Sequence, residues 1–343
     1  MKAAVLEQAH QPMVIKNIPD PTVGVNDVLI KVTAAGVCHS DIHIADGLLG
    51  TLGLDPFPLI MGHEIVGEIE QVGAEVTHLK PGTRVGAYWS FGCGHCHYCL
   101  SNKEQLCITN LSAGSIRSAG VTLPGGYAEY VTVGAEYAIP LPDEIEDVDA
   151  APFLCAGLTV YGGFKNAALK PGQRAAVLGL GGLGHMAIPI AKAMGAEVIA
   201  ITSTESKQAV AKQLGADHTI NATGADAGQK LLAMGGADVV LSTTVDPEAI
   251  AGVMQGLLPQ GTLALIGLTG EPLPVIPVPL VLTEQRVIGS AIGSRLDYQE
   301  LMHLAVQNNI RPMTETYALD DVNAVHDRLR AGKVRYRAVL NPN

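Results

Sequence analysis

The sequence GLGGLG at residues 179–184 restricts the fold of this chain more than any other feature. It follows RAAVL, an apolar run typical of a buried strand, and precedes HMAIPIAKAM, which has helical spacing. In such a turn the first glycine allows a tight bend, the second lets backbone approach a pyrophosphate, and the third lets the helix pack on the strand. The helix N-terminus adds free N–H groups that favour phosphate. We therefore predict a dinucleotide site formed by Gly179, Leu180, Gly181, Gly182, Leu183 and Gly184.

Strands and helices continue to alternate after this motif. EVIAITS, DHTI, ADVVLSTT and GTLALIGL have the composition of strands, and KQAVAKQLG has helical spacing. Strands that are apolar along their whole length are typical of a parallel sheet covered on both faces. Residues 149–287 are therefore predicted to form a doubly wound, parallel-sheet Rossmann domain, which makes the fold class α/β.

The rest of the chain has a different pattern. Before residue 149, short strand-like runs (VLIKVTAAGV, EIVGEIEQVG, TRVGAYW, YAEYVTV) alternate with Gly and Pro. We predict a mostly β domain over residues 1–148, and a chain of 343 residues is long enough for two domains. Residues 288–343 are expected to leave the Rossmann domain and return to the first domain.

The composition excludes several classes of protein. A hydrophobic content of 48% argues against disorder, and a net charge of −11 argues against nucleic acid or an anionic membrane as partner. The N-terminus MKAAVLEQAHQP lacks the apolar core of a signal peptide, and no run approaches the roughly 20 apolar residues of a membrane helix. We expect a soluble, cytoplasmic protein whose six cysteines are reduced.

Four of these cysteines predict a structural metal site. Cys93, Cys96, Cys99 and Cys107 can complete a tetrahedron around zinc and leave no position for substrate. Iron–sulfur ligation uses similar spacings and is the alternative, although nothing else in the sequence points to electron transfer. We predict a structural zinc lobe over about residues 90–110.

The residues after the second Rossmann strand bear on the choice of cofactor. About 20 residues beyond the glycine motif, an NAD site normally has an Asp or Glu that binds the ribose. This chain instead has Thr202, Ser203 and Thr204, followed by Lys207. Hydroxyls and an ammonium group suit the 2′-phosphate of NADP. We expect Ser203, Thr204 and Lys207 to bind cofactor and favour NADP over NAD, while the nearby Glu205 leaves open a pocket that accepts both.

The two remaining cysteines need a separate explanation. Cys38, Cys155 and His63 form a ligand set that would leave the fourth zinc position for water or a substrate oxygen. No local spacing links the three residues. From the residues alone, each could equally be an ordinary buried side chain.

The order and spacing of five motifs resemble the zinc-dependent medium-chain alcohol dehydrogenases over nearly the whole chain: GVCHSDIH, GHEIVGEIEQVG, CGHCHYC with Cys107, LCAGLTVY and GLGGLG. The resemblance implies a GroES-like catalytic domain interrupted by the Rossmann domain. It also implies two zinc ions per chain. One is catalytic, bound by Cys38, His63 and Cys155 with Glu64 beside it, and the other is the structural ion of the lobe.

The same resemblance implies roles in catalysis. Zinc would polarise the substrate oxygen and lower the pKa of a bound alcohol, giving an alkoxide from which hydride leaves. Ser40 would take the proton of that oxygen and pass it through the cofactor ribose to His43 and solvent. Asp41 would accept the second ring N–H of His63 and fix its tautomer.

Other positions are implied to contact cofactor or substrate. Thr159 corresponds to a position near the nicotinamide, and His39 and Arg337 correspond to positions on the pyrophosphate, with Arg335 as the alternative to Arg337. Trp89 follows a position that lines the substrate pocket. The resemblance further implies a small alcohol or aldehyde as substrate and a homo-oligomer, either a dimer or a tetramer.

The predicted function is reversible alcohol oxidation, with aldehyde reduction by NADPH as the expected direction. The segment Thr202–Thr204 resembles the NADP-using branch that includes cinnamyl alcohol dehydrogenase-like enzymes, whereas the segment before Cys155 also resembles tetrameric microbial alcohol dehydrogenases. Three alternatives stay open: an NAD-dependent alcohol dehydrogenase, a polyol, sorbitol or threonine dehydrogenase with the same zinc, and a non-catalytic relative that binds zinc and nucleotide.

Overall fold

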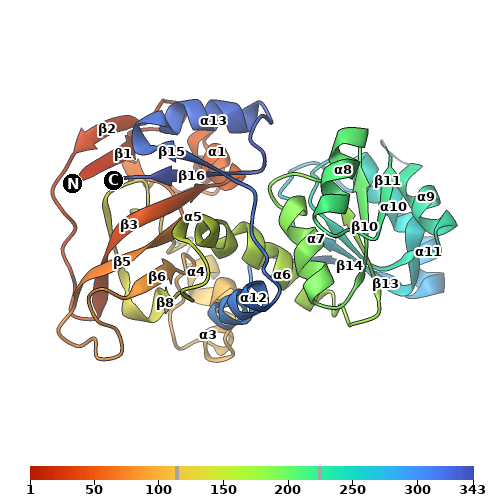
Figure 1. The fold of residues 1–343 in the computed structure, drawn as a ribbon, viewed down its shortest axis with the longest axis horizontal. Coiled ribbons are helices and arrows are strands. Elements are labelled where there is room, and N and C mark those ends of the chain that lie inside the picture. Colours follow the sequence, from red (N-terminus) through yellow and green to blue (C-terminus); the bar gives the residue numbers. More distant parts are fainter. Residues whose placement is uncertain (113–115, 223–225) are drawn as a thin grey trace. The chain divides into compact units, whose positions relative to one another are not determined.

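The computed structural model describes residues 1–112, 116–222 and 226–343, without the side chains of Leu111 and Ser112. The chain forms two compact units (Figure 1). The first contains residues 1–155, 294–306 and 311–343, and the second contains residues 156–293 and 307–310. Across the described residues, none of the helices combines the length and apolar character that crossing a bilayer requires.

The first unit is built on a mixed, mostly antiparallel sheet. Its strand order is β15 (Thr314–Ala318), β16 (Arg337–Asn341), β3 (Asp27–Val37), β5 (Glu64–Val72), β6 (Arg84–Ala87) and β8 (Ala138–Pro140), with β7 (Tyr130–Gly134) also paired to β3. Only β15 and β16 run parallel among these pairs. A second sheet contains β2 (Val14–Asn17), β1 (Lys2–Leu6) and β4 (Leu59–Ile60). The fold thus joins early and late parts of the sequence, as the red β3 beside the blue β16 shows (Figure 1).

Most helices of the first unit are short. They are α1 (His39–Ala45), α2 (Leu48–Thr51), α3 (His97–Leu100), α4 (Ile108–Ser112), α5 (Asp147–Ala150), α12 (Arg295–Gln307) and α13 (Val322–Arg330), with 3-10 turns η1 (Glu104–Leu106), η2 (Ala135–Tyr137), η3 (Ala151–Leu154) and η6 (Leu319–Asp321). The late helix α13 packs on α1, which carries several candidate site residues. Residues 311–343 belong to this first unit.

The second unit is a doubly wound α/β fold. Its parallel sheet has the order β11 (His218–Asn221), β10 (Glu197–Thr202), β9 (Arg174–Leu178), β12 (Ala237–Ser242), β13 (Leu257–Leu265) and β14 (Arg286–Gly289). Its helices are α6 (Ala156–Asn166), α7 (Gly184–Ala193), α8 (Glu205–Gln213), α9 (Ala227–Ala233), α10 (Pro247–Val253) and α11 (Pro277–Thr283), with the 3-10 turn η5 (Met254–Gly256). Helices α7 and α8 lie on one side of the sheet, and α9, α10 and α11 lie on the other (Figure 1). The predicted α/β architecture, a mostly β domain with a doubly wound, parallel-sheet domain, is confirmed.

The apolar runs of the sequence form the core of the second unit. In the central strands β9, β10 and β12 nearly every side chain is buried, because helices cover both faces. The polar ends of two helices are capped by their own chain. Thr204 accepts the backbone N–H of Lys207 at the start of α8, and Asp246 does the same for two N–H groups of α10.

The units do not end where the sequence pattern changes. Helices α5 and η3 pack on β3 and β5 of the first unit, and the apolar side chains of η3 are all buried. The first unit therefore runs to Cys155 rather than to residue 148. At the other boundary, β14 extends the parallel sheet, so the second unit continues to Gly293 rather than to residue 287.

Candidate active site

Adjacent strands of the large sheet bring distant parts of the chain together. The register pairs Gly36 of β3 with Glu64 at the start of β5, and it sets Ala338 of β16 opposite the last residue of β3. Cys38 follows the end of β3, and His63 precedes β5. Because β3 lies between β5 and β16, the chemically active residues of all three segments meet at one end of the sheet.

Cys38, His63, Glu64 and Cys155 form a compact cluster. Ligand atoms from the four side chains lie within 4.8 Å of one another, and the Sγ atoms of Cys38 and Cys155 are 3.8 Å apart. Contact with Cys155 lowers the pKa of Cys38 well below its usual value, which favours the thiolate that binds metals. Two thiols, an imidazole and a carboxylate in this arrangement fit zinc.

Asp41 orients His63. Its Oδ1 lies 3.2 Å from His63 Nδ1, and its Oδ2 accepts the Cys38 N–H at 2.8 Å and the Tyr127 hydroxyl at 2.9 Å. Burial acts to lower the pKa of His63, but the Asp41 carboxylate outweighs it and raises that pKa. The Trp89 ring contacts the imidazole edge-on, with centroids 5.1 Å apart. With Nδ1 donating to Asp41, His63 Nε2 is the nitrogen left for a metal.

Glu64 and Arg337 form a buried ion pair beside the cluster. Arg337 Nη2 donates to Glu64 Oε1, and the side chains are 4% and 0% exposed. Burial raises the pKa of Glu64 to about 7 against the opposing effect of Arg337. Glu64 Oε2 is buried and has no hydrogen-bond partner within the described part of the chain. An unpaired carboxylate oxygen beside three ligand side chains fits a residue that lies next to a metal.

Helix α1 carries the residues predicted to move a proton. Ser40 Oγ lies 3.7 Å from Cys38 Sγ. Ser40 and His43 are three residues apart on a helix and share one face, and both are half-buried. His39 is exposed, with its ring 6.5 Å from that of His43. The structure thus brings Ser40 next to the cluster and places His43 on the same face of α1.

The second cluster is the predicted lobe. The Sγ atoms of Cys93, Cys96, Cys99 and Cys107 lie within 4.8 Å of one another, with 3.5 Å between Cys96 and Cys99. Hydrogen bonds from Thr109 and backbone N–H groups lower the pKa of Cys93 to about 5. Four thiols at these separations fit a closed, structural zinc site.

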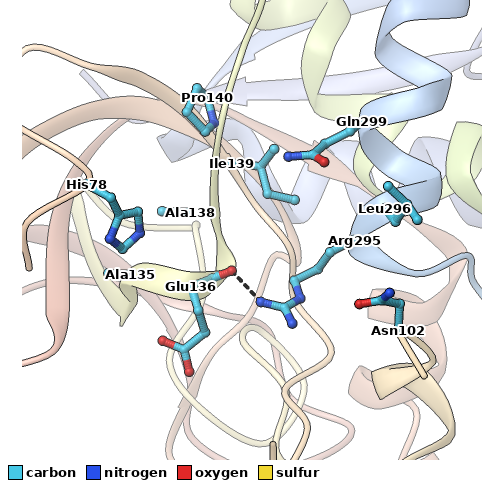
Figure 2. A pocket seen from close by; sticks show the side chains of 10 residues that line it. All are labelled: His78, Asn102, Ala135, Glu136, Ala138, Ile139, Pro140, Arg295, Leu296 and Gln299. Atoms are coloured by element: carbon cyan, nitrogen blue, oxygen red, sulfur yellow. Dashed lines mark hydrogen bonds between the residues drawn. The ribbon is translucent and has the colours of Figure 1, made fainter. Parts of the chain in front are cut away.

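Glu104 fastens this lobe to α12. Its buried carboxylate accepts Arg295 Nε at 2.6 Å and the backbone N–H of Arg295 at 3.1 Å. Arg295 also donates to the Glu136 carbonyl at 2.7 Å and lies over the Tyr137 ring, whose hydroxyl accepts the Gly92 N–H at 3.0 Å. Figure 2 shows Arg295 and Glu136 in the wall of a pocket of about 320 Å³. None of the predicted ligand or relay residues lines this pocket, so it is separate from the cluster around Cys38.

The turn between β9 and α7 has the geometry that the glycine motif predicts. Gly179 has a φ of +96°, Gly181 has open space at its Cβ position, and a Cβ at Gly184 would lie 2.1 Å from the Gly179 carbonyl oxygen. The first glycine is thus needed for conformation and the third for helix packing, while the second leaves backbone uncovered. Dinucleotide binding by the six residues 179–184 stays a prediction.

The residues predicted to select the cofactor follow the neighbouring strand. Ser203 and Thr204 are exposed at the turn from β10 to α8, and Lys207 is half-buried in the first turn of α8. Since β9 and β10 are parallel neighbours, this turn and the glycine turn lie at the same edge of the sheet. Thr159 lies in α6 of the second unit, whereas His39 and Arg337 belong to the first unit.

Sequence reasoning missed two residues that support the metal clusters. Tyr127 contacts Asp41, and Glu104 anchors the lobe. The only signal for Glu104 is a charged residue between Cys99 and Cys107, which is common on a surface. Tyr127 lies in a strand-like run where an apolar packing role is the ordinary interpretation.

Comparison with known proteins agrees with this geometry. Residues 24–143 match the family model "Alcohol dehydrogenase GroES-like domain", and residues 182–307 match "Zinc-binding dehydrogenase". An alcohol dehydrogenase of Geobacillus stearothermophilus is 40% identical over 343 residues, which cover 99% of each chain. The NADP-dependent alcohol dehydrogenase C 1 of Mycolicibacterium smegmatis is 34% identical and covers 99% of this chain and 97% of its own.

A solved structure extends the likeness to three dimensions. The alcohol dehydrogenase of Aeropyrum pernix superposes with a TM-score of 0.90 and 32% identity over 100% of both chains. Such similarity over the full length supports an oxidoreductase that acts on an alcohol. Taken with the two cysteine clusters and the glycine turn, it shows that this chain belongs to the zinc-type medium-chain alcohol dehydrogenase family.

Proposed function

We propose that this protein interconverts a small alcohol and its aldehyde or ketone, using NADP(H) and a zinc ion at Cys38, His63 and Cys155. The observation that carries the proposal is the cluster itself, in which two thiols and an oriented imidazole lie beside a hydroxyl on α1. Three protein ligands are the number found in catalytic zinc sites, where one position stays open. A zinc ion held there supplies Lewis acidity toward the alcohol oxygen.

The protein residues around the cluster hold its geometry and move the proton. Asp41 keeps Nδ1 of His63 protonated, which leaves Nε2 as the ligand atom. Ser40 Oγ accepts the alcohol proton, and His43 on the same face of α1 delivers it to solvent. Arg337 holds the Glu64 carboxyl group beside the ligands. A nicotinamide cofactor bound to the second unit would supply the hydride-accepting chemistry.

The preference for NADP rests on the turn after β10. Exposed hydroxyls at Ser203 and Thr204 and the ammonium group of Lys207 are donors for a 2′-phosphate. A relative from Mycolicibacterium smegmatis is NADP-dependent by name. NAD is the alternative because Glu205, also exposed in this turn, could bind a ribose that carries no phosphate.

We also propose that the protein is a homo-oligomer. Strand β14 is an edge strand of its sheet, and an unpaired edge is a template for association. In and beside α11, Ile276, Val278, Val281 and Leu282 are between 64% and 78% exposed. Apolar side chains gathered in one segment are typical of a surface that is covered by a partner. Light scattering coupled to gel filtration should give a dimer or a tetramer, and a monomer would refute this expectation.

The activity is tested by following reduced-cofactor absorbance with NADPH and NADH in parallel, across aliphatic and aromatic aldehydes. Turnover with NADPH above that with NADH is the expected result. Equal or faster turnover with NADH would overturn the preference for NADP. No turnover by a folded, zinc-loaded sample would favour a non-catalytic binding protein instead.

Two variants separate the metal from the proton path. Cys155→Ala should lower the zinc content from two ions per chain to one and abolish activity. Ser40→Ala should keep both ions and lower turnover by about 10²–10⁴-fold, the usual size of a general acid–base contribution. A Ser40→Ala enzyme as fast as wild type would exclude Ser40 from the proton path.

A further inference from the structure

Tyr127 contacts two of the three chain segments that carry the ligands of the candidate catalytic metal, those of Cys38 and His63. Its hydroxyl donates to Asp41 Oδ2 at 2.9 Å, and the same oxygen accepts the backbone N–H of Cys38 at 2.8 Å. Its own backbone N–H donates to the carbonyl of Met61 at 3.0 Å, two residues before His63. Tyr127 is 0% exposed, so these bonds form without competition from bulk water.

The Tyr127 ring also packs directly against the backbone that precedes His63. Gly62 has a φ of +90°, and a Cβ there would lie 2.4 Å from Cδ1 of the tyrosine ring. The Gly62 carbonyl accepts the Gly126 N–H at 2.8 Å, and a Cβ at Gly125 would lie 2.3 Å from that carbonyl oxygen. Only glycine at these positions lets the two chain segments approach so closely, and this closeness allows the ring to lie against Gly62.

We propose that Tyr127 is a positioning residue that locks two of the three ligand segments of the catalytic metal, those of Cys38 and His63, to one another. Its hydroxyl holds Asp41, Asp41 holds the imidazole of His63, and its ring and backbone hold the chain just before His63. This role rests on the proposed function, since it assumes a metal at Cys38, His63 and Cys155. The Tyr127 hydroxyl acts on His63 through Asp41, whereas its ring and backbone act through the chain that precedes His63.

The lobe provides a matched control. Tyr137 is a second buried tyrosine whose hydroxyl bonds to the chain beside a cysteine cluster, accepting the Gly92 N–H at 3.0 Å and donating to the Gly92 carbonyl at 3.1 Å. Tyr127→Phe and Tyr137→Phe remove the same group, one near each cluster. A merely structural loss would weaken both metal sites or neither.

The test measures zinc release from the intact protein to an excess of a chelator with a colorimetric zinc indicator. Wild type should release two ions in two phases, and Cys155→Ala identifies the catalytic phase by losing it. Changing a residue that holds a metal-binding histidine typically weakens metal affinity by 10–100-fold. For Tyr127→Phe, which acts through Asp41, we expect the catalytic phase to become about tenfold faster while the lobe phase stays within about twofold. Tyr137→Phe should show the reverse.

The outcomes separate this proposal from the function on which it rests. A faster catalytic phase in Tyr127→Phe, with the lobe phase unchanged, supports the role of Tyr127. If the wild type binds two ions and Tyr127→Phe accelerates both phases, or neither, the role of Tyr127 is overturned. If Tyr127→Phe folds too poorly to assay, Asp41→Asn must accelerate the same phase or the connection through Asp41 is refuted. A wild-type protein that binds one ion, in the lobe only, would instead overturn the proposed function.

Discussion

The glycine turn allows stability and cofactor binding to be separated by two substitutions of the same kind. Gly184 and Gly181 lie three residues apart in one motif, but only Gly184 is in close contact. In Gly184→Ala the new Cβ would lie 2.1 Å from the Gly179 carbonyl oxygen, so α7 or the turn must shift. In Gly181→Ala the new Cβ meets nothing within 4 Å, and φ lies outside the left-handed region. Gly184→Ala should therefore lower the stability of the fold, and Gly181→Ala should lower the affinity for a cofactor that binds at the turn.

The magnitudes follow from these contacts. Overpacking a well-packed site costs about 1–3 kcal/mol, and a clash with backbone belongs in the upper part of that range. Alanine in place of glycine in a helix stabilises the folded state by up to about 1 kcal/mol, which offsets part of this cost. Gly184→Ala should therefore destabilise the protein by about 2 kcal/mol, or about 4–8 °C in Tm for a unit of this size. Gly181→Ala should be neutral or stabilising by up to about 1 kcal/mol.

Cofactor binding should give the opposite order. If a pyrophosphate lies against bare backbone at Gly181, a methyl group there costs about 1–3 kcal/mol of binding, or roughly 5–150-fold in Kd. Gly184→Ala, where folded, should bind within about threefold of wild type, because its Cβ points at Gly179 rather than at the ligand. Thermal unfolding and titration with NADPH and NADH measure both quantities. A Gly184→Ala protein as stable as wild type, or a Gly181→Ala protein with unchanged affinity for both cofactors, would refute the reasoning.

Three further predictions address the cofactor, the lobe and the effect of pH. Lys207→Ala should raise the Kd for NADPH by about tenfold and leave that for NADH within about twofold, since one charge-assisted hydrogen bond is lost; equal losses for both would argue against a phosphate contact. Glu104→Gln should destabilise the lobe by about 1–2 kcal/mol, which is less than the loss of a fully buried pair because Arg295 is 33% exposed. As a control, Glu136→Gln should leave the melting temperature unchanged, because only the backbone carbonyl of Glu136 contacts Arg295. Burial acts to raise the pKa of Glu315, but a tyrosine hydroxyl, a backbone N–H and an arginine outweigh it and lower that pKa. The contribution of Glu315 to stability is therefore present above its unfolded pKa of about 4.3 and is lost as pH falls through the lower, folded pKa. The deficit of Glu315→Gln in thermal unfolding should accordingly shrink from about pH 7 to about pH 3, and a constant deficit would contradict this sign.

The parts of the fold that depend on local patterns were predictable from the sequence. Apolar runs gave β9, β10 and β12 because residues buried on both faces leave a continuous signal. The lobe was predictable because its ligands are close in sequence and carry their chemistry in the side chain. The boundaries of the two units were harder to predict from the sequence. Helix η3 is apolar like the segments that follow it, and only its packing on β3 and β5 assigns it to the first unit.

Contacts between distant residues account for the rest. Arg337 and Glu64 are separated by 273 positions, and no spacing in the sequence connects them. The resemblance predicted a cofactor contact for Arg337, and the structure adds a buried carboxylate partner that composition could not reveal. Tyr127 and Asp41 are likewise 86 positions apart. Such pairs depend on sheet register, which the sequence specifies only through the complete pattern of buried faces.

The interleaving of the first unit sets an order in which a growing chain can complete its two clusters. The lobe cysteines lie close together in sequence, so this cluster can assemble while the segment is being synthesised. The other cluster needs β3 and β5 in register and then Cys155, and its buried charge pair needs β16, which is made only after the inserted second unit. Until β16 arrives, the last residues of β3, which β7 does not cover, have an open edge and Glu64 lacks its cation. During synthesis we therefore expect a stage in which the second unit is complete and the sheet of the first unit is not, and we expect aggregation or chaperone capture to be most frequent at that stage.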